Sequence, residues 1–471
     1  MWRKRGAGRV GIVRRMHEGS ARMGADGAAG GSSPADPVEL LRSRRYVAIL
    51  VMGAVVGVPV AVVAYFFLKV VGELQHYVFT TLPGDLGFDA EPSWWPIPMV
   101  ALGGLLVALA ISRLPGTGGH EPAEGFKTGE TQPVALAGIV AASLATLSFG
   151  AVLGPEAPLI AIGGGLGILA VNLTRRDVPD TARLVIGVAG SFAAVSTLLG
   201  SPLTGAFLLM EVAGVGGPML GIVLTPGLLA AGVGALIFIG LDSWTGFGTF
   251  SLAVPNIPPF GTPDVVEFLW AIGAGVAGAV VGVAIRRGAL MLQPVVARRR
   301  LLWTPAAGAA VGCLAVVFAE ATDRGSSQVL FSGQDALPGL IHSAGGWTVG
   351  ALVLLVVCKG AAYSLSLSAF RGGPVFPGMF VGAAGGIALS HLPGLPMIVG
   401  AAIGIGAVSV AMLRFPLTSV LLTSLFLQDD GLALMPLVIV AVVVSHVVTA
   451  RLEPPAPSAA GAGGQGPPQP P

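Results

Sequence analysis

The stretch LGPEAPLIAIGGGLG, from Leu153 to Gly167, places one carboxylate, Glu156, between two prolines inside a long apolar run. A carboxylate that faced lipid at this depth would cost several kcal/mol, so it is expected to face protein or a watery cavity. The role of Glu156 is therefore the question on which both the fold and the function depend.

The composition indicates a multi-pass membrane protein. The 471 residues have a mean hydropathy of +0.82 and only 11% are charged, too little charge for a soluble domain of this size. Apolar runs recur at Tyr46–Val71, Pro98–Ser112, Pro133–Leu147, Pro158–Leu173, Leu184–Leu199, Pro202–Val212, Pro218–Ile239, Val265–Ile285, Trp303–Ala319, Gly350–Leu367, Phe376–Leu389, Pro396–Leu413, Pro416–Leu427 and Leu432–Val448.

Several of these runs are shorter than the roughly 20 residues that span a bilayer. Together with 71 glycines and 36 prolines, they predict helices that end at mid-membrane. Broken helices are tolerated only where they line a protein-buried or watery cavity, which favours transport over anchoring.

The charge distribution predicts the orientation in the cell membrane. Arginines cluster in two places, and the segments Glu73–Trp95 and Leu241–Asp264 contain neither lysine nor arginine. Positive loops stay in the cytoplasm, so these two segments are expected to face outward and both termini to be cytoplasmic. The arginines concerned are Arg175, Arg176 and Arg183 in one loop, and Arg286, Arg287, Arg298, Arg299 and Arg300, which are predicted to flank another.

Three regions follow from the composition. Residues 1–37 are predicted to be a disordered basic arm, residues 38–452 the transmembrane domain, and residues 453–471 a disordered tail rich in Pro, Gly and Ala.

An internal repeat divides the transmembrane domain. GPEAPLIAIGGGLG from Gly154 matches GPVFPGMFVGAAGG from Gly373, 219 positions later, and a Pro-Leu-Thr triplet recurs at Pro202 and Pro416. Order and spacing are both kept, which predicts two repeats, at about residues 46–240 and 265–450. Transporters built from repeats place their site at the midplane, where the N-termini of half-helices converge.

Each repeat motif has the chemistry of a helix start. A proline suits the first helical position, and the free amides of that first turn attract anions. The second motif presents the neutral Val375 and Phe376, whereas the first presents Glu156 at the corresponding place. Such a carboxylate can fill an anion site, compete with a permeating anion and be released by protonation, which would make it a gate. The alternative is that Glu156 only caps a buried helix.

At these residues the chain resembles the CLC family of chloride channels and chloride/proton antiporters. The similarity covers about Tyr46 to Arg451 and includes LGPEAP, GGPVFPGMFVGAAGG and both Pro-Leu-Thr helices. It implies an all-α homodimer, built from two inverted repeats in each subunit, that transports chloride or another small anion through the bilayer. Glu156 falls on the family's gating glutamate. The amides of Val375 and Phe376, with the turn at Gly118 and Gly119, are the candidate anion ligands.

The chain also departs from the family pattern. The turn PGTGGHEP has no serine at the place of the family's serine hydroxyl, Pro374 has no N–H to donate, and no tyrosine follows Tyr363. The family's internal proton-accepting glutamate falls on Val212, with Glu211 before it. Valine there is typical of the family's channels, although fluoride exporters also lack that glutamate.

Other polar residues allow two interpretations each. His120, with Glu121 and Glu124, either lines a vestibule and relays protons or is a solvated loop residue. Glu211 either serves the proton pathway or has a structural partner. The serines that precede the second motif, Ser364, Ser366 and Ser368, are expected to bond within the membrane helices, and one of them could instead face the pathway. Arg371 either draws anions in or snorkels to the interface.

The function predicted from the sequence is therefore a chloride channel with a glutamate gate. A proton-coupled antiporter for chloride or fluoride is the first alternative, and a non-conducting scaffold is another. An intramembrane enzyme would need a nucleophile–base pair or metal ligands, and the sequence shows no such pattern. No nucleotide, metal, prosthetic group or nucleic acid is implied.

Overall fold

The computed structural model describes residues 42–126, 130–174, 179–214, 218–246, 254, 261–427 and 431–453. The predicted arm at residues 1–37 lies outside these ranges, as does the predicted tail except for its first residue. The chain separates into two units, Met1–Ala48 and Ile49–Pro471. The second unit carries the repeats and the site.

The described residues form helices joined by turns, with a single antiparallel bridge, which confirms the all-α class. The α-helices are α3 (Arg44–His76), α4 (Leu82–Asp85), α5 (Pro96–Arg113), α6 (Leu136–Ser148), α7 (Glu156–Thr174), α8 (Asp180–Leu199), α9 (Pro202–Ala213), α10 (Pro218–Thr245), α11 (Val265–Arg298), α12 (Arg300–Thr322), α13 (Ala336–His342), α14 (Val349–Ala369), α15 (Val375–Leu389), α16 (Met397–Leu413), α17 (Pro416–Leu427) and α18 (Gly431–Leu452). A π-helical turn, η1, covers Tyr77–Thr81, and 3₁₀ turns lie at η2 (Pro115–Gly118), η3 (Pro122–Glu124), η4 (Pro133–Ala135), η5 (Ser326–Gln328) and η6 (Ala344–Gly346).

Every predicted apolar run coincides with helical structure, apart from Pro396, which is the N-cap of α16. Nine helices in the described ranges are long and apolar enough to cross a membrane. Shorter apolar helices, which include α9, α15, α16 and α17, lie between them. Side chains at helix starts set several of the boundaries. Asp264 and Glu267 form a capping box at the start of α11, and Ser201 and Thr348 cap α9 and α14.

One predicted boundary is wrong. Arg286 and Arg287 were expected to flank a loop with Arg298, but α11 continues unbroken to Arg298. The segment between them carries several apolar residues. An interior proline removes one helix hydrogen bond and can kink a helix, but neither Gly288 nor Pro294 ends α11 here.

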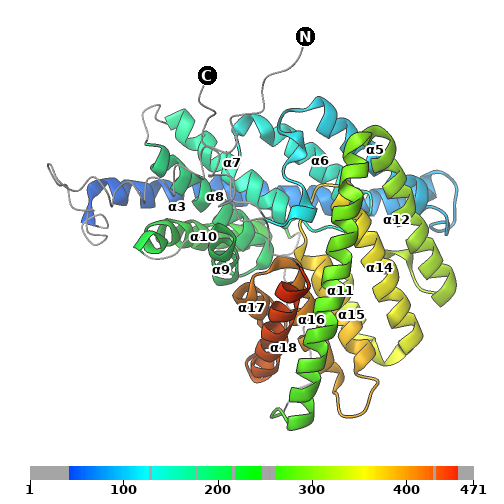
Figure 1. Cartoon of the computed structure of the whole chain (residues 1–471). Coiled ribbons are helices and arrows are strands. Elements are labelled where there is room, and N and C mark those ends of the chain that lie inside the picture. The colour runs from blue at the N-terminus through cyan, green and yellow to red at the C-terminus, as the bar shows by residue number, and fades with distance from the viewer. Residues whose placement is uncertain are drawn as a thin grey trace, which may run out of the picture. The chain divides into compact units, whose positions relative to one another are not determined.

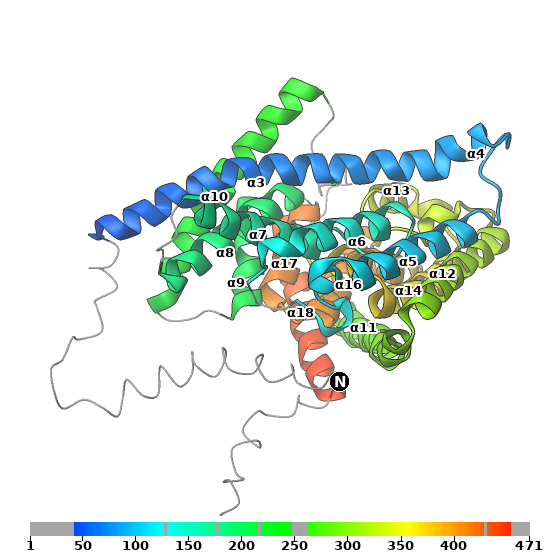
Figure 2. The same cartoon turned by 90° about the horizontal axis from the view of Figure 1, so that it is seen from above.

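The two repeats have the same order of helices. In sequence order, α3, α5, α6, α7, α8, α9 and α10 correspond to α11, α12, α14, α15, α16, α17 and α18. The packing corresponds as well: α7 packs on α8 and α15 on α16, while α10 packs on α8 and α18 on α16 (Figure 1). Two corresponding pairs also contact each other across the repeats, α5 with α12 (Figure 2) and α9 with α17.

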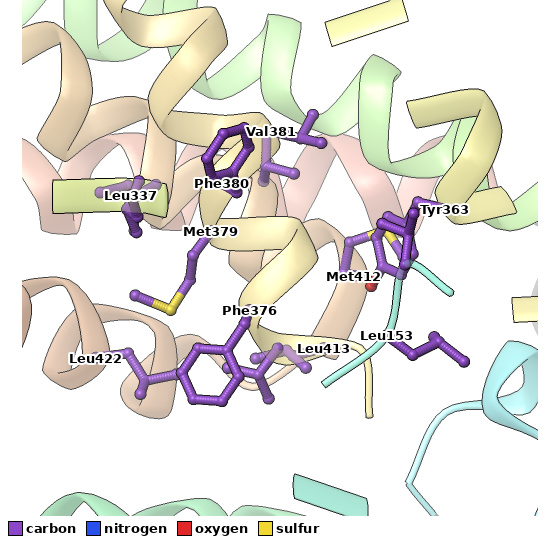
Figure 3. Packing of buried hydrophobic residues seen from close by; sticks show 14 of the residues in the cluster. Leu153, Leu337, Tyr363, Phe376, Met379, Phe380, Val381, Met412, Leu413 and Leu422 are labelled. Carbon is purple, nitrogen blue, oxygen red and sulfur yellow. The ribbon is translucent and has the colours of Figure 1, made fainter. Parts of the chain in front are cut away.

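Glycines bring the paired helices of each repeat unusually close. A Cβ at Gly163 of α7 would overlap with the carbonyl oxygen of Gly190 in α8, and a Cβ at Gly382 of α15 would overlap with that of Gly404 in α16. These glycines therefore serve close helix packing. On α15, Phe376 lies beside Leu413 and Leu422 in the apolar core (Figure 3).

Candidate anion site

The two copies of the repeat motif meet through their first glycines. Gly154 N donates to Gly373 O at 2.8 Å, and Gly373 N donates to Gly154 O at 2.6 Å. The repeat makes these residues equivalent, and each bonds the other in the same way. A two-fold relation between the repeats produces this reciprocal antiparallel pairing, which the sequence repeat alone did not reveal.

Glu156 begins α7 directly after this bridge, and its side chain reaches across to the other repeat. Its Oε1 accepts a hydrogen bond from Phe376 N at 3.0 Å, and the backbone amides of Val375 and of Glu156 itself also interact with the carboxylate. The residue has no solvent exposure. The carboxylate therefore fills the N-terminus of α15, where amide groups and the helix dipole favour an anion.

Two glycines, Gly154 and Gly373, enclose the carboxylate of Glu156. A Cβ at Gly373 would overlap with Glu156 Oε2, and a Cβ at Gly154 would overlap with both carboxylate oxygens. Glu156 Oε2 has no hydrogen-bond partner among the described residues. Oε1 is thus hydrogen-bonded, whereas Oε2 is enclosed by the two glycines.

Tyr363 is a neighbour of the site that the sequence did not single out. It is fully buried on α14, and its hydroxyl donates to Pro374 O at 2.6 Å, just before α15 begins. Ser366 of the same helix accepts from Val152 N at 3.0 Å and donates to Ala362 O. Ser368 donates to Leu365 O. Both of these serines bond backbone atoms, which is the packing role expected of them.

The turn proposed to hold the anion lies beside Arg371. Gly116, Thr117, Gly118 and Gly119 all have positive φ, and the closest atoms to a Cβ at Gly118 belong to Ala142, Ile111 and Arg371. Arg371 is buried, so it does not snorkel. The structure therefore brings Glu156, Val375 and Phe376 together. It places Gly118 elsewhere, against the buried side chain of Arg371.

Glu211 caps a helix of the other repeat. Its Oε1 accepts from Leu417 N at 3.0 Å, and its Oε2 accepts from Thr418 N at 2.7 Å and from the Thr418 hydroxyl. Both oxygens are therefore used at the start of α17, which agrees with the structural interpretation of Glu211.

His120 lies on a cavity that reaches the residue next to the gate. The cavity has a volume of about 80 Å³, and its lining includes His120, Ala157, Ser191 and Val212. Val212, on which the family resemblance places the internal proton-accepting glutamate, contributes an apolar wall to this cavity. Within the described ranges, no group of three His, Cys, Asp or Glu side chains is arranged to hold a metal ion.

Comparison with known proteins shows which family this chain resembles in sequence. The family model described as voltage gated chloride channel matches residues 103–450. The "Putative ion-transport protein YfeO" of Escherichia coli (strain SMS-3-5 / SECEC) is 28% identical over 363 residues, covering 75% of this chain and 82% of that protein. The protein of the same name from Shigella boydii serotype 4 is also 28% identical over the same shares.

Solved structures share the fold. A slow cyanobacterial Cl⁻/H⁺ antiporter aligns with a TM-score of 0.68 at 19% identity, over 86% of this chain and 94% of that chain. A CLC-type fluoride/proton antiporter aligns with a TM-score of 0.58 at 20% identity, over 86% of this chain and 96% of that chain.

Proposed function

We propose, from the premise that this chain belongs to the voltage-gated chloride channel (CLC) family of membrane transport proteins, that it conducts chloride through a pathway gated by Glu156. The function is anion transport across a membrane in which the chain is a multi-pass protein. The observation that carries the proposal is the hydrogen bond from Phe376 N to the Glu156 carboxylate, because the gate occupies the place where an anion would bind.

The gate opens when the carboxylate leaves the N-terminus of α15. Protonation removes its negative charge and with it most of the attraction to the helix amides. The amides of Val375 and Phe376 are then free to bind chloride. The absence of a Cβ at Gly154 and Gly373 gives the carboxylate the space that it occupies at this place, since a Cβ at either position would overlap with it.

The identity of residue 212 and the contacts of Glu211 favour a channel over a proton-coupled exchanger. Val212 cannot carry a proton, and both oxygens of Glu211 are held by the backbone of α17. In this proposal Glu156 alone responds to protons.

The test is chloride efflux from proteoliposomes that contain wild-type protein or Glu156→Gln. We expect Glu156→Gln to raise efflux at pH 7 by about ten-fold or more and to remove its increase at low pH, because the amide carries no charge into the site. Glu320→Gln, an exposed acid at the end of α12, is the matched control and should behave as the wild type. Equal efflux and an equal pH response in wild type and Glu156→Gln would contradict the gate.

A proton-coupled antiporter for chloride or fluoride is the second candidate, because the cavity joins His120 to Ala157, the residue after the gate. Both structural neighbours named above are described as proton antiporters. In the same vesicles, anion efflux would then drive proton uptake, and His120→Gln would abolish that uptake while anion efflux continues. Absence of chloride and fluoride movement in wild type and Glu156→Gln alike would favour the scaffold.

The proposal includes the homodimer and the membrane orientation predicted from the sequence. The protein is a homodimer in the cell membrane, with one pathway in each subunit and both termini in the cytoplasm. Residues 38–452 form the conducting domain of each subunit.

A further inference from the structure

A second buried charge lies at the Gly118 turn. Arg371 is only 3% exposed and stands two residues before Gly373, in the segment that joins α14 to α15. Its backbone N–H donates to the Thr146 hydroxyl at 3.2 Å, which fixes this segment to α6. A Cβ at Gly118 would be 3.4 Å from Arg371 Cγ, so the guanidinium stem lies directly against the turn.

The guanidinium group makes three long contacts. Its Nε donates to Thr117 O at 3.4 Å, Nη1 donates to Phe370 O at 3.2 Å, and Nη2 donates to Glu121 Oε1 at 3.4 Å. A guanidinium has five N–H groups and forms its strong bonds to carboxylates at about 2.7–2.9 Å. Arg371 is therefore buried with its hydrogen-bonded counter-charge, Glu121, 3.4 Å away, although a buried charge normally requires a close partner. Glu124 is a second acid whose charge acts on Arg371.

Glu121 is held more closely by another arginine. Arg300 Nη2 donates to Glu121 Oε1 at 2.6 Å, and Gln293 Nε2 donates to Glu121 Oε2. Burial alone would raise the pKa of Glu121, but the bonds from Arg300 and Gln293 and the charges of Arg371 and Arg300 outweigh burial and lower it. Glu121 is thus an anion shared unequally between two cations.

We propose that Arg371 is a second anion-binding residue of the pathway, and that Glu121 is its resident counter-anion, which an entering chloride displaces. The inference rests on the proposed function. Chloride takes the N–H groups of Arg371, while Glu121 keeps its closer bond to Arg300 and is not left as an unpaired buried charge. The arrangement corresponds to that of Glu156: in both places a carboxylate of the protein occupies a positive site.

The experiment measures initial chloride efflux against internal chloride concentration for wild type, Arg371→Gln, Arg371→Lys and Glu121→Gln in proteoliposomes. We expect Arg371→Gln to raise the half-saturating chloride concentration about ten-fold or more, because a charge-assisted hydrogen bond is lost. Arg371→Lys should fall between wild type and Arg371→Gln. Glu121→Gln should shift the half-saturating concentration in the opposite direction, because chloride no longer competes with a carboxylate.

Arg451→Gln, which removes an exposed arginine at the end of α18, is the control and should keep the wild-type half-saturating concentration. If Arg371→Gln does not fold, Glu121→Gln still tests the inference, since it leaves Arg371 in place. Unchanged half-saturation in the folded variants, or shifts of Arg371→Gln and Glu121→Gln in the same direction, would overturn this inference alone. A wild type that carries no chloride would overturn the proposed function, and this inference with it.

Discussion

At the scale of single residues, backbone groups define the candidate site more than side chains do. An amide of α15 binds Glu156, and a carbonyl before α15 accepts from Tyr363. The repeat identified Glu156, Val375 and Phe376, because helix-start chemistry is visible in a sequence. Tyr363 was not identified, because its partner is a carbonyl oxygen that every residue has.

Tyr363→Phe tests how far the start of α15 depends on that hydroxyl. The change leaves Pro374 O buried without its donor, which is expected to cost about 1–3 kcal/mol of stability. The measurement is the thermal unfolding midpoint in detergent. Tyr77→Phe, at an exposed tyrosine on η1, should change the midpoint little. Equal midpoints for Tyr363→Phe and the wild type would show that another group satisfies the carbonyl.

At the scale of elements, each repeat is organised around one pair of helices, α7 with α8 and α15 with α16. Glycines at their crossings let the two backbones of each pair touch. The sequence predicted the existence of the helices well, because apolar runs and proline-led starts are local signals. It placed a loop within α11, because arginines were taken as a loop signal although their long stems are tolerated on helices. The repeat pattern could not by itself predict the two-fold relation of the repeats, because no local pattern encodes which chain directions meet. That relation was expected only from the resemblance to the CLC family.

Gly386→Ala tests the crossing of α15 and α16. A Cβ there would overlap with the carbonyl oxygen of Gly400, so the helices must separate. Insertion of one carbon into a packed core costs about 1–3 kcal/mol. We expect a loss of stability at the upper end of this range, about 3 kcal/mol, because the blocking atoms belong to the backbone and cannot rotate away. Gly240→Ala on α10, where a Cβ meets nothing within 4 Å, is the control in the same thermal unfolding assay. Similar midpoints for the two variants would contradict the close crossing.

At the scale of the whole molecule, nine apolar helices in the described ranges and the family make this a multi-pass protein. Orientation in the membrane follows from charge and not from packing, so the fold itself does not determine it. The sequence therefore remains the basis of the prediction that the segment from Glu73 to Trp95 faces outward and that Arg298, Arg299 and Arg300 face the cytoplasm.

Labelling of single cysteines tests this orientation. In a background with Cys313→Ser and Cys358→Ser, we expect a membrane-impermeant maleimide applied to intact cells to label Asp89→Cys and not Arg299→Cys. Both positions are exposed, so both should react once the cells are permeabilised, which is the control. Labelling of only Arg299→Cys in intact cells would reverse the orientation.

The reciprocal bonds between Gly154 and Gly373 have a consequence for the two copies of the motif. Two identical half-length chains could form this pairing, but each would then bring the same residue to the centre. A carboxylate in both copies would set two like charges against each other, and a carboxylate in neither would leave the amides at both helix starts without this anion. In one chain the two copies of the motif can differ, so that the first presents Glu156 and the second presents the amides that bind its carboxylate.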